Sequence, residues 1–140
     1  MDEFGKVSHS ESSPVPDQLR GLFNHPDDVR VQKLPRAGLS REDRGSMAVF
    51  FGAGARTVPH THHHGQHLFI SEGTGVVGDE KGVHIVRVGD VVSSPPGAWH
   101  WHGGTPTAAM THLTVEKPGD FDLDVDRRDW DSAYGPELGA

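Results

Sequence analysis

Histidine side chains gather in two short segments in the middle of the chain. The sequence contains 11 histidines and no cysteine, and most of the histidines lie in residues 60–67 and 99–102. Imidazole nitrogens bind divalent transition metals. Because cysteine is absent, thiolate metal sites, cysteine nucleophiles and disulfides are excluded. A metal site in this chain would therefore use nitrogen and oxygen ligands.

The spacing inside each segment suits a strand. Alternate residues of a strand point to the same face, so His60 and His62 can project together into an interior, and so can His100 and His102. A His-x-His pair by itself also occurs in solvated surface loops, where histidine-rich runs capture metals without a function. The pattern around the pairs decides between these two interpretations.

The two segments lie inside two longer patterns. These patterns are Gly54-x5-His60-x-His62-x3-Gln66-x6-Gly73 and Gly89-x5-Pro95-x-Gly97-x2-His100. Both resemble the two signature motifs of the cupin superfamily, and the resemblance covers roughly residues 47–116. It implies an all-β fold, a double-stranded β-helix or jelly-roll barrel, with one divalent metal ion inside. The ligands that it implies are His60, His62, Gln66 and His100.

Gln66 stands where the superfamily pattern usually has Glu. A narrower group shares this feature: the cupins associated with carboxymuconolactone decarboxylase-like proteins and the cupin-type hydroxynitrile lyases. The matching segments are Gly54-Ala55-Arg56-Thr57-x-x-His60-Thr61-His62, Gly65-Gln66, Gly89-Asp90-Val91-Val92, Pro96-Gly97-x-x-His100-Trp101-His102-Gly103 and Thr105-Pro106-Thr107-x-Ala109-Met110-Thr111-His112. The resemblance favours Mn2+ as the metal, and Fe2+, Zn2+ and Ni2+ also suit such ligands.

A neutral ligand set has chemical consequences. Three imidazoles and an amide leave the 2+ charge of an ion uncompensated, which strengthens it as a Lewis acid. The same set disfavours oxidation to a 3+ ion, which argues against iron chemistry that activates O2. The expected ion would therefore act on a hydroxyl, carbonyl or carboxylate oxygen of a substrate.

Two further histidines can serve as the general base that a Lewis acid needs. His102 shares a strand face with His100, and His112 shares one with Met110 and Thr114. An unperturbed imidazole has a pKa near 6.5, so either one can accept a proton around neutral pH. His112 is the first choice, because it matches a histidine of the lyase group. The alternative is a structural histidine with hydrogen bonds inside the barrel.

The substrate pocket is expected next to this interior. Its predicted lining residues are Met47, Val49, His64 and Glu116. His63 and His67 fall out of phase with the ligand face and are assigned to a solvated loop. An apolar pocket with few polar groups favours a small, partly apolar substrate.

Three functions remain open at this point. The leading one is a metal-dependent enzyme with lyase-type carbon–carbon bond chemistry, as in cyanohydrin cleavage, or a related decarboxylation, isomerisation or cyclisation. A dioxygenase is the second, and it would need Fe2+, Ni2+ or Cu and consume O2. The third is a cupin that binds a small ligand without turning it over.

The elements that must position these residues are short strands. Runs of β-favouring residues broken by Gly, Pro and Asp occur at 29–34, 47–51, 67–70, 75–78, 83–88, 91–93 and 108–115, and no sustained helical periodicity accompanies them. This spacing is typical of a sandwich or barrel. We expect a flexible arm at 1–16, the barrel at 17–118 and an acidic tail at 119–140, packed loosely or with one short helix near Asp129.

Charge and hydropathy limit the partners. With 13 basic and 20 acidic residues the formal charge is −7, which disfavours nucleic acid and anionic membrane surfaces. No apolar run approaches the length of a membrane span, and the first residues do not resemble a secretory signal, so a cytoplasmic location is expected. Trp99 and Trp101 face away from the predicted ligands and need apolar cover. A second subunit would supply it, which predicts a homodimer.

Overall fold

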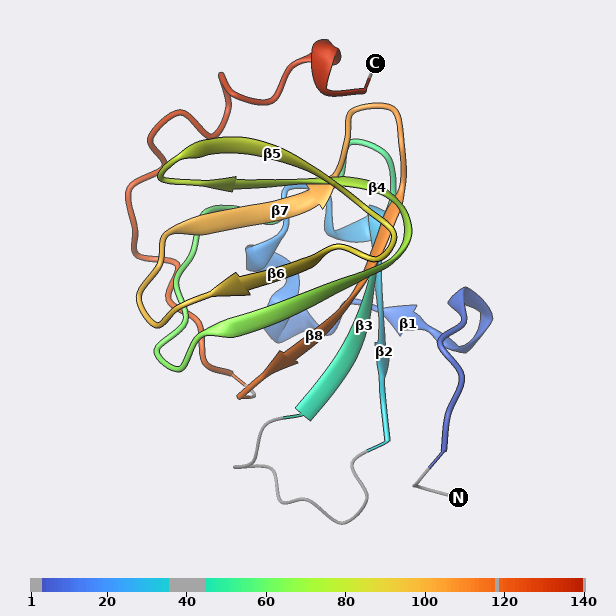
Figure 1. Ribbon diagram of the computed structural model, residues 1–140. Helices are drawn as coiled ribbons and strands as arrows, with labels where there is room; N and C mark the ends of the chain where they lie inside the picture. The colour runs from blue at the N-terminus through green and yellow to red at the C-terminus, as the bar shows by residue number, and fades with distance from the viewer. Residues whose placement is uncertain (1–3, 36–44, 118, 140) are drawn as a thin grey trace.

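A computed structural model describes residues 4–35, 45–117 and 119–139 (Figure 1). Its eight strands are β1 (Ser13–Pro14), β2 (Val29–Lys33), β3 (Gly45–Phe51), β4 (Gln66–Asp79), β5 (Gly82–Arg87), β6 (Val91–Ser94), β7 (His100–Gly104) and β8 (Met110–Glu116). Four short 3-10 helices are η1 (His9–Glu11), η2 (Asp17–Leu22), η3 (Pro26–Asp28) and η4 (Pro136–Gly139). Within the described part of the chain, no helix has the length and apolar character needed to cross a membrane.

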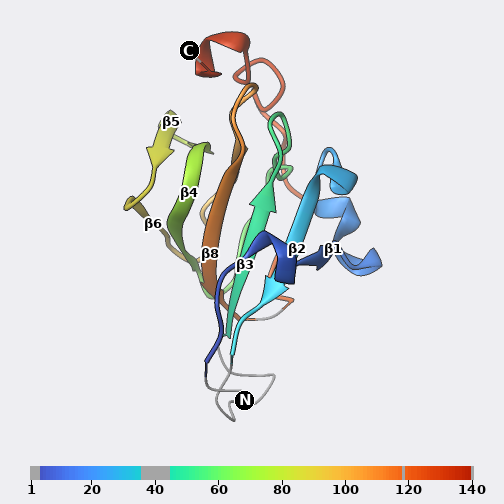
Figure 2. The same ribbon diagram turned by 90° about the vertical axis from the view of Figure 1, so that its right-hand side faces the viewer.

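All strand pairs are antiparallel, and their order is β1-β2-β3-β8-β4-β5, with β6 and β7 also paired to β4. The first half of β4 pairs with β6 and β8, and its second half pairs with β5 and β7. The strand therefore bends from one sheet into the other, past a bulge between Ile70 and Glu72. Figure 2 shows β4, β8, β3 and β2 side by side in that order, with β5 and β6 on the other side of β4. This arrangement confirms the all-β jelly-roll prediction.

Period-two alternation positions the interior residues. On β8, His112 and Thr114 are buried and the intervening Leu113 is partly exposed. Val49 of β3 lies opposite His112, so the two strands present their side chains to one interior. The predicted runs 67–70 and 75–78 are two halves of the single strand β4. The interior is therefore a barrel core into which alternate residues of several strands point.

The N-terminal segment differs from the predicted flexible arm. Within residues 4–16, β1 pairs with β2, and Val15 is buried in the core. The Arg30 guanidinium donates to both the hydroxyl and the carbonyl of Ser12, each at 2.8 Å. No local sequence pattern predicts these contacts or the burial of Val15. The first three residues of the expected arm lie outside the described residues.

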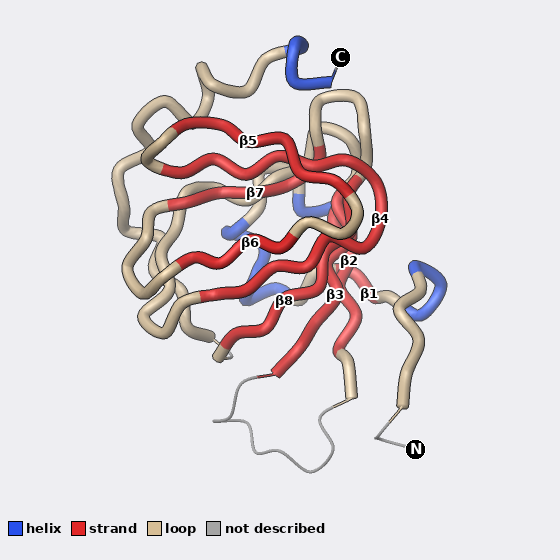
Figure 3. The backbone as a smooth tube through the Cα atoms, in the orientation of Figure 1, coloured by secondary structure: helices blue, strands red, loops and turns tan. Residues whose placement is uncertain are grey.

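The C-terminal segment, residues 119–139, runs past the ends of the strands and over the β5 edge of the barrel (Figure 3), and it packs against Trp99 and Trp101. It contains turns at 128–133 and the helix η4, instead of a short helix near Asp129. Trp130 packs in a second apolar cluster with Trp99 and Trp101. Trp99, which directly precedes β7, is 5% exposed, and Trp101 of β7 is 1% exposed. Their cover therefore comes from the chain itself, which corrects the expectation that a second subunit supplies it.

Arg56 attaches this segment to the barrel. Its guanidinium carbon lies 3.8 Å from the ring centre of Trp130 and 4.0 Å from that of Tyr134. It also donates a 2.6 Å hydrogen bond to the Trp130 carbonyl. Burial lowers the Arg56 pKa to about 10, so the group stays cationic near neutral pH. Cation–π contacts of a desolvated guanidinium stabilise such an arrangement.

Candidate metal centre

Backbone pairing brings the two histidine segments together. The amide of His60 donates to the carbonyl of His100 at 3.0 Å, and the reverse bond is 3.1 Å. The side chains of His60, His62 and His100 are all buried, and one ring nitrogen from each lies within 4.8 Å of the others. Three imidazole nitrogens this close together could hold a divalent ion.

Each of these imidazoles is held at its Nδ1 atom by a backbone carbonyl. The distances are 2.8 Å from His60 to Val58, 2.6 Å from His62 to Asp120 and 3.1 Å from His100 to Ala98. A carbonyl only accepts, so this contact places the imidazole proton on Nδ1 and leaves a lone pair on Nε2. Histidines that bind metals are held in this way by their other nitrogen.

The free lone pairs fit a bound cation. Burial lowers the pKa of His100 to about 4 and that of His60 well below its usual value, so both imidazoles are neutral near pH 7. Among the residues that the structure describes, none bonds the buried Nε2 atom of His62. Nε2 of His100 lies 3.1 Å from Oε1 of Gln66, which is another acceptor. Nε2 of His100 and Oε1 of Gln66 thus face each other with lone pairs, and Nε2 of His62 adds a third. A divalent ion bound to these atoms would satisfy all three.

Gln66 reaches the cluster because the chain turns sharply at Gly65. That residue has φ of 77°, and a Cβ atom there would lie 2.9 Å from the carbonyl oxygen of Ser94. Glycine fits this left-handed, crowded position. The turn starts β4 at Gln66, whose side chain is buried beside His100. The structure thus brings all four predicted ligands together.

The two predicted bases lie next to each other. Nε2 of His112 is 3.0 Å from Nδ1 of His102, and both imidazoles are buried. Burial lowers the pKa of His112 to about 3 and that of His102 well below its usual value. The His102 ring stacks on His100 with centres 5.5 Å apart, and Phe51 packs against His112 at 5.2 Å. The pair therefore forms a buried, neutral extension of the histidine cluster.

The predicted pocket residues lie in different places. Val49 is buried opposite His112, and Met47, two residues earlier on β3, is half-buried opposite Thr114. His64 is exposed on the surface loop. Glu116 is close to the cluster, with Oε2 3.2 Å from Nδ1 of His62. Met47, Val49 and Glu116 thus lie near the barrel interior, while His64 lies on the exposed loop that follows His62.

Asp120 is a site residue that the sequence does not reveal. Besides its carbonyl bond to His62, its carboxylate accepts the backbone amides of His63 and His64 at 2.9 and 2.7 Å. Burial raises its pKa, but hydrogen bonds from His64 and His63 outweigh burial, and the net pKa is lowered. Asp120 therefore holds the loop that follows His62.

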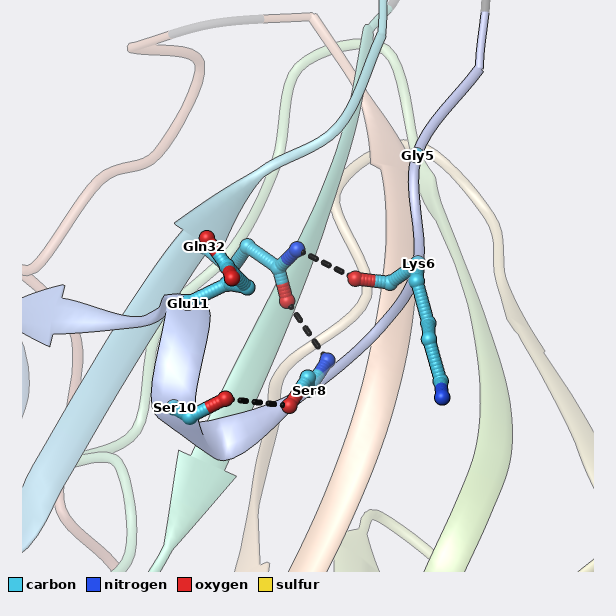
Figure 4. A pocket seen from close by; sticks show the side chains of 6 residues that line it. All are labelled: Gly5, Lys6, Ser8, Ser10, Glu11 and Gln32. Carbon is cyan, nitrogen blue, oxygen red and sulfur yellow. Dashed lines mark hydrogen bonds between the residues drawn. The ribbon is translucent and has the colours of Figure 1, made fainter.

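A polar recess of about 420 Å3 lies elsewhere, on the N-terminal segment (Figure 4). Its lining residues are Gly5, Lys6, Ser8, Ser10, Glu11 and Gln32. The Gln32 side chain spans it, donating to the Lys6 carbonyl and accepting from the Ser8 amide. It contains none of the predicted site residues, so it is separate from the histidine cluster.

The fold and the cluster together define a small antiparallel barrel protein with a buried cluster of three histidines that could hold a metal ion. Comparison with known proteins gives the family: residues 48–116 match the Cupin domain family. A curated relative, the (R)-mandelonitrile lyase of Granulicella tundricola, is 45% identical over 110 residues, covering 78% of this chain and 71% of the relative. The chain belongs to the cupin family, and its resemblance to the hydroxynitrile lyase group is confirmed.

Solved structures agree with this assignment. A cupin-like protein from Thermotoga maritima is 29% identical with a TM-score of 0.66, covering 77% of this chain and 86% of that one. The polyketide cyclase RemF from Streptomyces resistomycificus is 17% identical with a TM-score of 0.67, covering 97% and 96%. At 17% identity the second likeness shows the fold alone.

Proposed function

We propose that this chain is a metal-dependent lyase that cleaves or forms a carbon–carbon bond beside an oxygen of a small organic molecule. Cyanohydrin cleavage is the reaction we favour, because the curated relative is named a mandelonitrile lyase. His60, His62, Gln66 and His100 would hold one divalent ion. Mn2+ is our first choice, ahead of Fe2+, Zn2+ and Ni2+, all of which accept nitrogen and oxygen ligands.

When bound, such an ion supplies Lewis acidity that makes a substrate hydroxyl easier to deprotonate. The His102–His112 pair lies beside the cluster and accepts the hydroxyl proton. The carbon–carbon bond then breaks, its electron pair leaves with the cyanide, and a carbonyl group forms. Cyanide takes the proton from the histidine pair and departs as hydrogen cyanide, so atoms and charges balance.

The surroundings of His112 suit this role. With its pKa lowered to about 3 by burial, His112 is unprotonated near neutral pH but is a weak base, so it would rely on the ion to acidify the substrate hydroxyl. The same burial makes the protonated ring costly, which favours prompt transfer of that proton to the leaving cyanide. Phe51 packs against both imidazoles and keeps water away from the pair.

The observation that carries this proposal is the set of Nδ1–carbonyl bonds that leaves buried lone pairs facing one another beside a second histidine pair. The first experiment is metal analysis of untagged protein and of a variant with both His60→Ala and His62→Ala. A matched control replaces the exposed His63 and His67 by Ala. About one equivalent of metal in parent and control, lost from the first variant, is expected.

Turnover decides between the functions. Release of benzaldehyde from mandelonitrile by the metal-loaded parent supports the lyase. Substrate-dependent O2 consumption would instead identify a dioxygenase. A ligand that binds and is recovered unchanged would identify a binding cupin. Equal metal in all three proteins of the preceding experiment would contradict the proposed site altogether.

A further inference from the structure

Glu116 places a carboxylate beside two of the four predicted ligands, His62 and Gln66. It shares one face of β8 with His112 and Thr114, and its side chain is 18% exposed. Its Oε2 atom is 3.2 Å from Nδ1 of His62, and its Oε1 atom accepts a 3.1 Å bond from the Thr114 hydroxyl. The carboxylate therefore lies against the outer nitrogen of His62, whose N–H is directed mainly at the Asp120 carbonyl at 2.6 Å.

Glu116 also touches a second donor, across the strands. His67 of β4 is paired with Val115 of β8, so Gln66 faces Glu116 one step further along. Burial raises the pKa of Glu116 overall, and its contacts with His62, the Thr114 hydroxyl and the Gln66 side chain oppose that rise. Because a carboxylate only accepts hydrogen bonds, the amide must present its N–H group to Glu116. This orientation turns Oε1 the other way, toward Nε2 of His100.

The charge of Glu116 is as important as its geometry. None of the four predicted ligands is a carboxylate, and burying the Glu116 carboxylate away from water is costly unless a positive charge offsets the cost. A divalent ion at the four donors would offset it through His62 and Gln66. Glu116 thus gains stability when a cation is present, and the cation gains the negative charge that its own ligands lack.

We propose that Glu116 is a positioning residue of the metal centre. It turns the Gln66 amide oxygen toward the ion and supplies a compensating negative charge through His62. This inference rests on the proposed function only in requiring a divalent ion at the four donors. It makes Glu116 part of the metal-binding apparatus, in addition to the pocket-lining role predicted from the sequence.

Mn2+ affinity tests this inference, compared by calorimetry in the parent, Glu116→Gln and Glu72→Gln. Glutamine keeps the shape but removes the charge, and Glu72 is an exposed carboxylate on β4 that serves as control. We expect Glu116→Gln to bind Mn2+ about 10- to 100-fold more weakly. The metal-free Glu116→Gln protein should unfold at the same or a higher urea concentration, because its burial cost is relieved.

The outcomes separate the two proposals. Unchanged Mn2+ affinity in Glu116→Gln, with the parent binding one equivalent, would overturn the role of Glu116 alone. Weaker binding accompanied by an equally destabilised metal-free protein would also overturn it, since that result marks a merely structural residue. A parent that binds no Mn2+ at the four donors would overturn both proposals. A changed Mn2+ electron paramagnetic resonance spectrum in Glu116→Gln, but not in Glu72→Gln, would support the positioning role.

Discussion

Nε2 of His112 and Nδ1 of His102 lie 3.0 Å apart inside the barrel, so one of these two neutral imidazoles must donate a proton to the other. A proton that arrives at either ring can therefore be passed along the pair. The pair also adjoins the three-histidine cluster, because the His102 ring centre is 5.4 Å from that of His60. Proton transfer and metal binding are thus located in one continuous set of imidazoles.

Replacing His112 by Ala should abolish turnover and spare the metal. A positioned general base typically contributes a factor of about 10² to 10⁴ to the rate, and we expect kcat to fall by that factor. The metal content should stay at the parent level, because His112 is not among the four donors. Steady-state kinetics with metal analysis checks this. Full turnover in the variant would rule out His112 as the base.

The stability of the metal-free protein should decrease in mild acid. Burial lowers the pKa of His100 to about 4 and that of His112 to about 3, while the unfolded chain takes up these protons near pH 6.5. The unfolded state therefore binds more protons between these values, and stability falls as the pH drops through this window. Each such histidine contributes about 1.4 kcal/mol per pH unit. A urea midpoint that stays constant from pH 7 to pH 5 would contradict this.

Asp120→Asn should loosen the loop after His62. Hydrogen bonds to a charged group contribute about 1.5 to 3 kcal/mol, and Asn keeps only part of them, so we expect the free energy of unfolding to fall by about 1 to 2 kcal/mol at pH 7. The net pKa of Asp120 is lowered by these bonds, so the parent's advantage is present above pH 4 and lost as the carboxyl protonates. Urea unfolding at pH 7 and pH 3 checks this, with the exposed Asp124→Asn as control.

Trp130→Ala should detach the C-terminal segment. Trp130 is buried, and its indole N–H donates a 3.0 Å bond to the Thr57 carbonyl. Truncation of a buried tryptophan costs about 3 to 5 kcal/mol, which urea unfolding followed by circular dichroism measures. Trp130→Phe keeps an aromatic ring over Arg56 and should lose less. A loss below about 1 kcal/mol for the alanine variant would show that the segment contributes little to stability.

A homodimer stays a prediction, and Trp99 and Trp101 no longer support it because the C-terminal segment covers them. Light scattering on the purified protein measures its mass. Twice the chain mass is the expected result, and a monomer would refute it.

The residues that sequence patterns place correctly are those with local constraints. The two motifs implied His60, His62, Gln66 and His100 as ligands, and the structure brings these four side chains close together. Asp120 and Trp130 are different, because their partners lie more than 50 residues away. No local periodicity encodes such contacts, and the composition of the segment made it look like a solvated acidic tail.

The packing of the C-terminal segment also determines which part of the protein tryptophan fluorescence reports on. All three tryptophans of the chain lie in the cluster beneath that segment, with Arg56 and Arg128 stacked on their rings. Intrinsic tryptophan fluorescence therefore reports mainly on the environment of this cluster. A spectral change on adding Mn2+ could reach these tryptophans through His100, which lies between Trp99 and Trp101 in the chain, or through Asp120, which is bonded to His62.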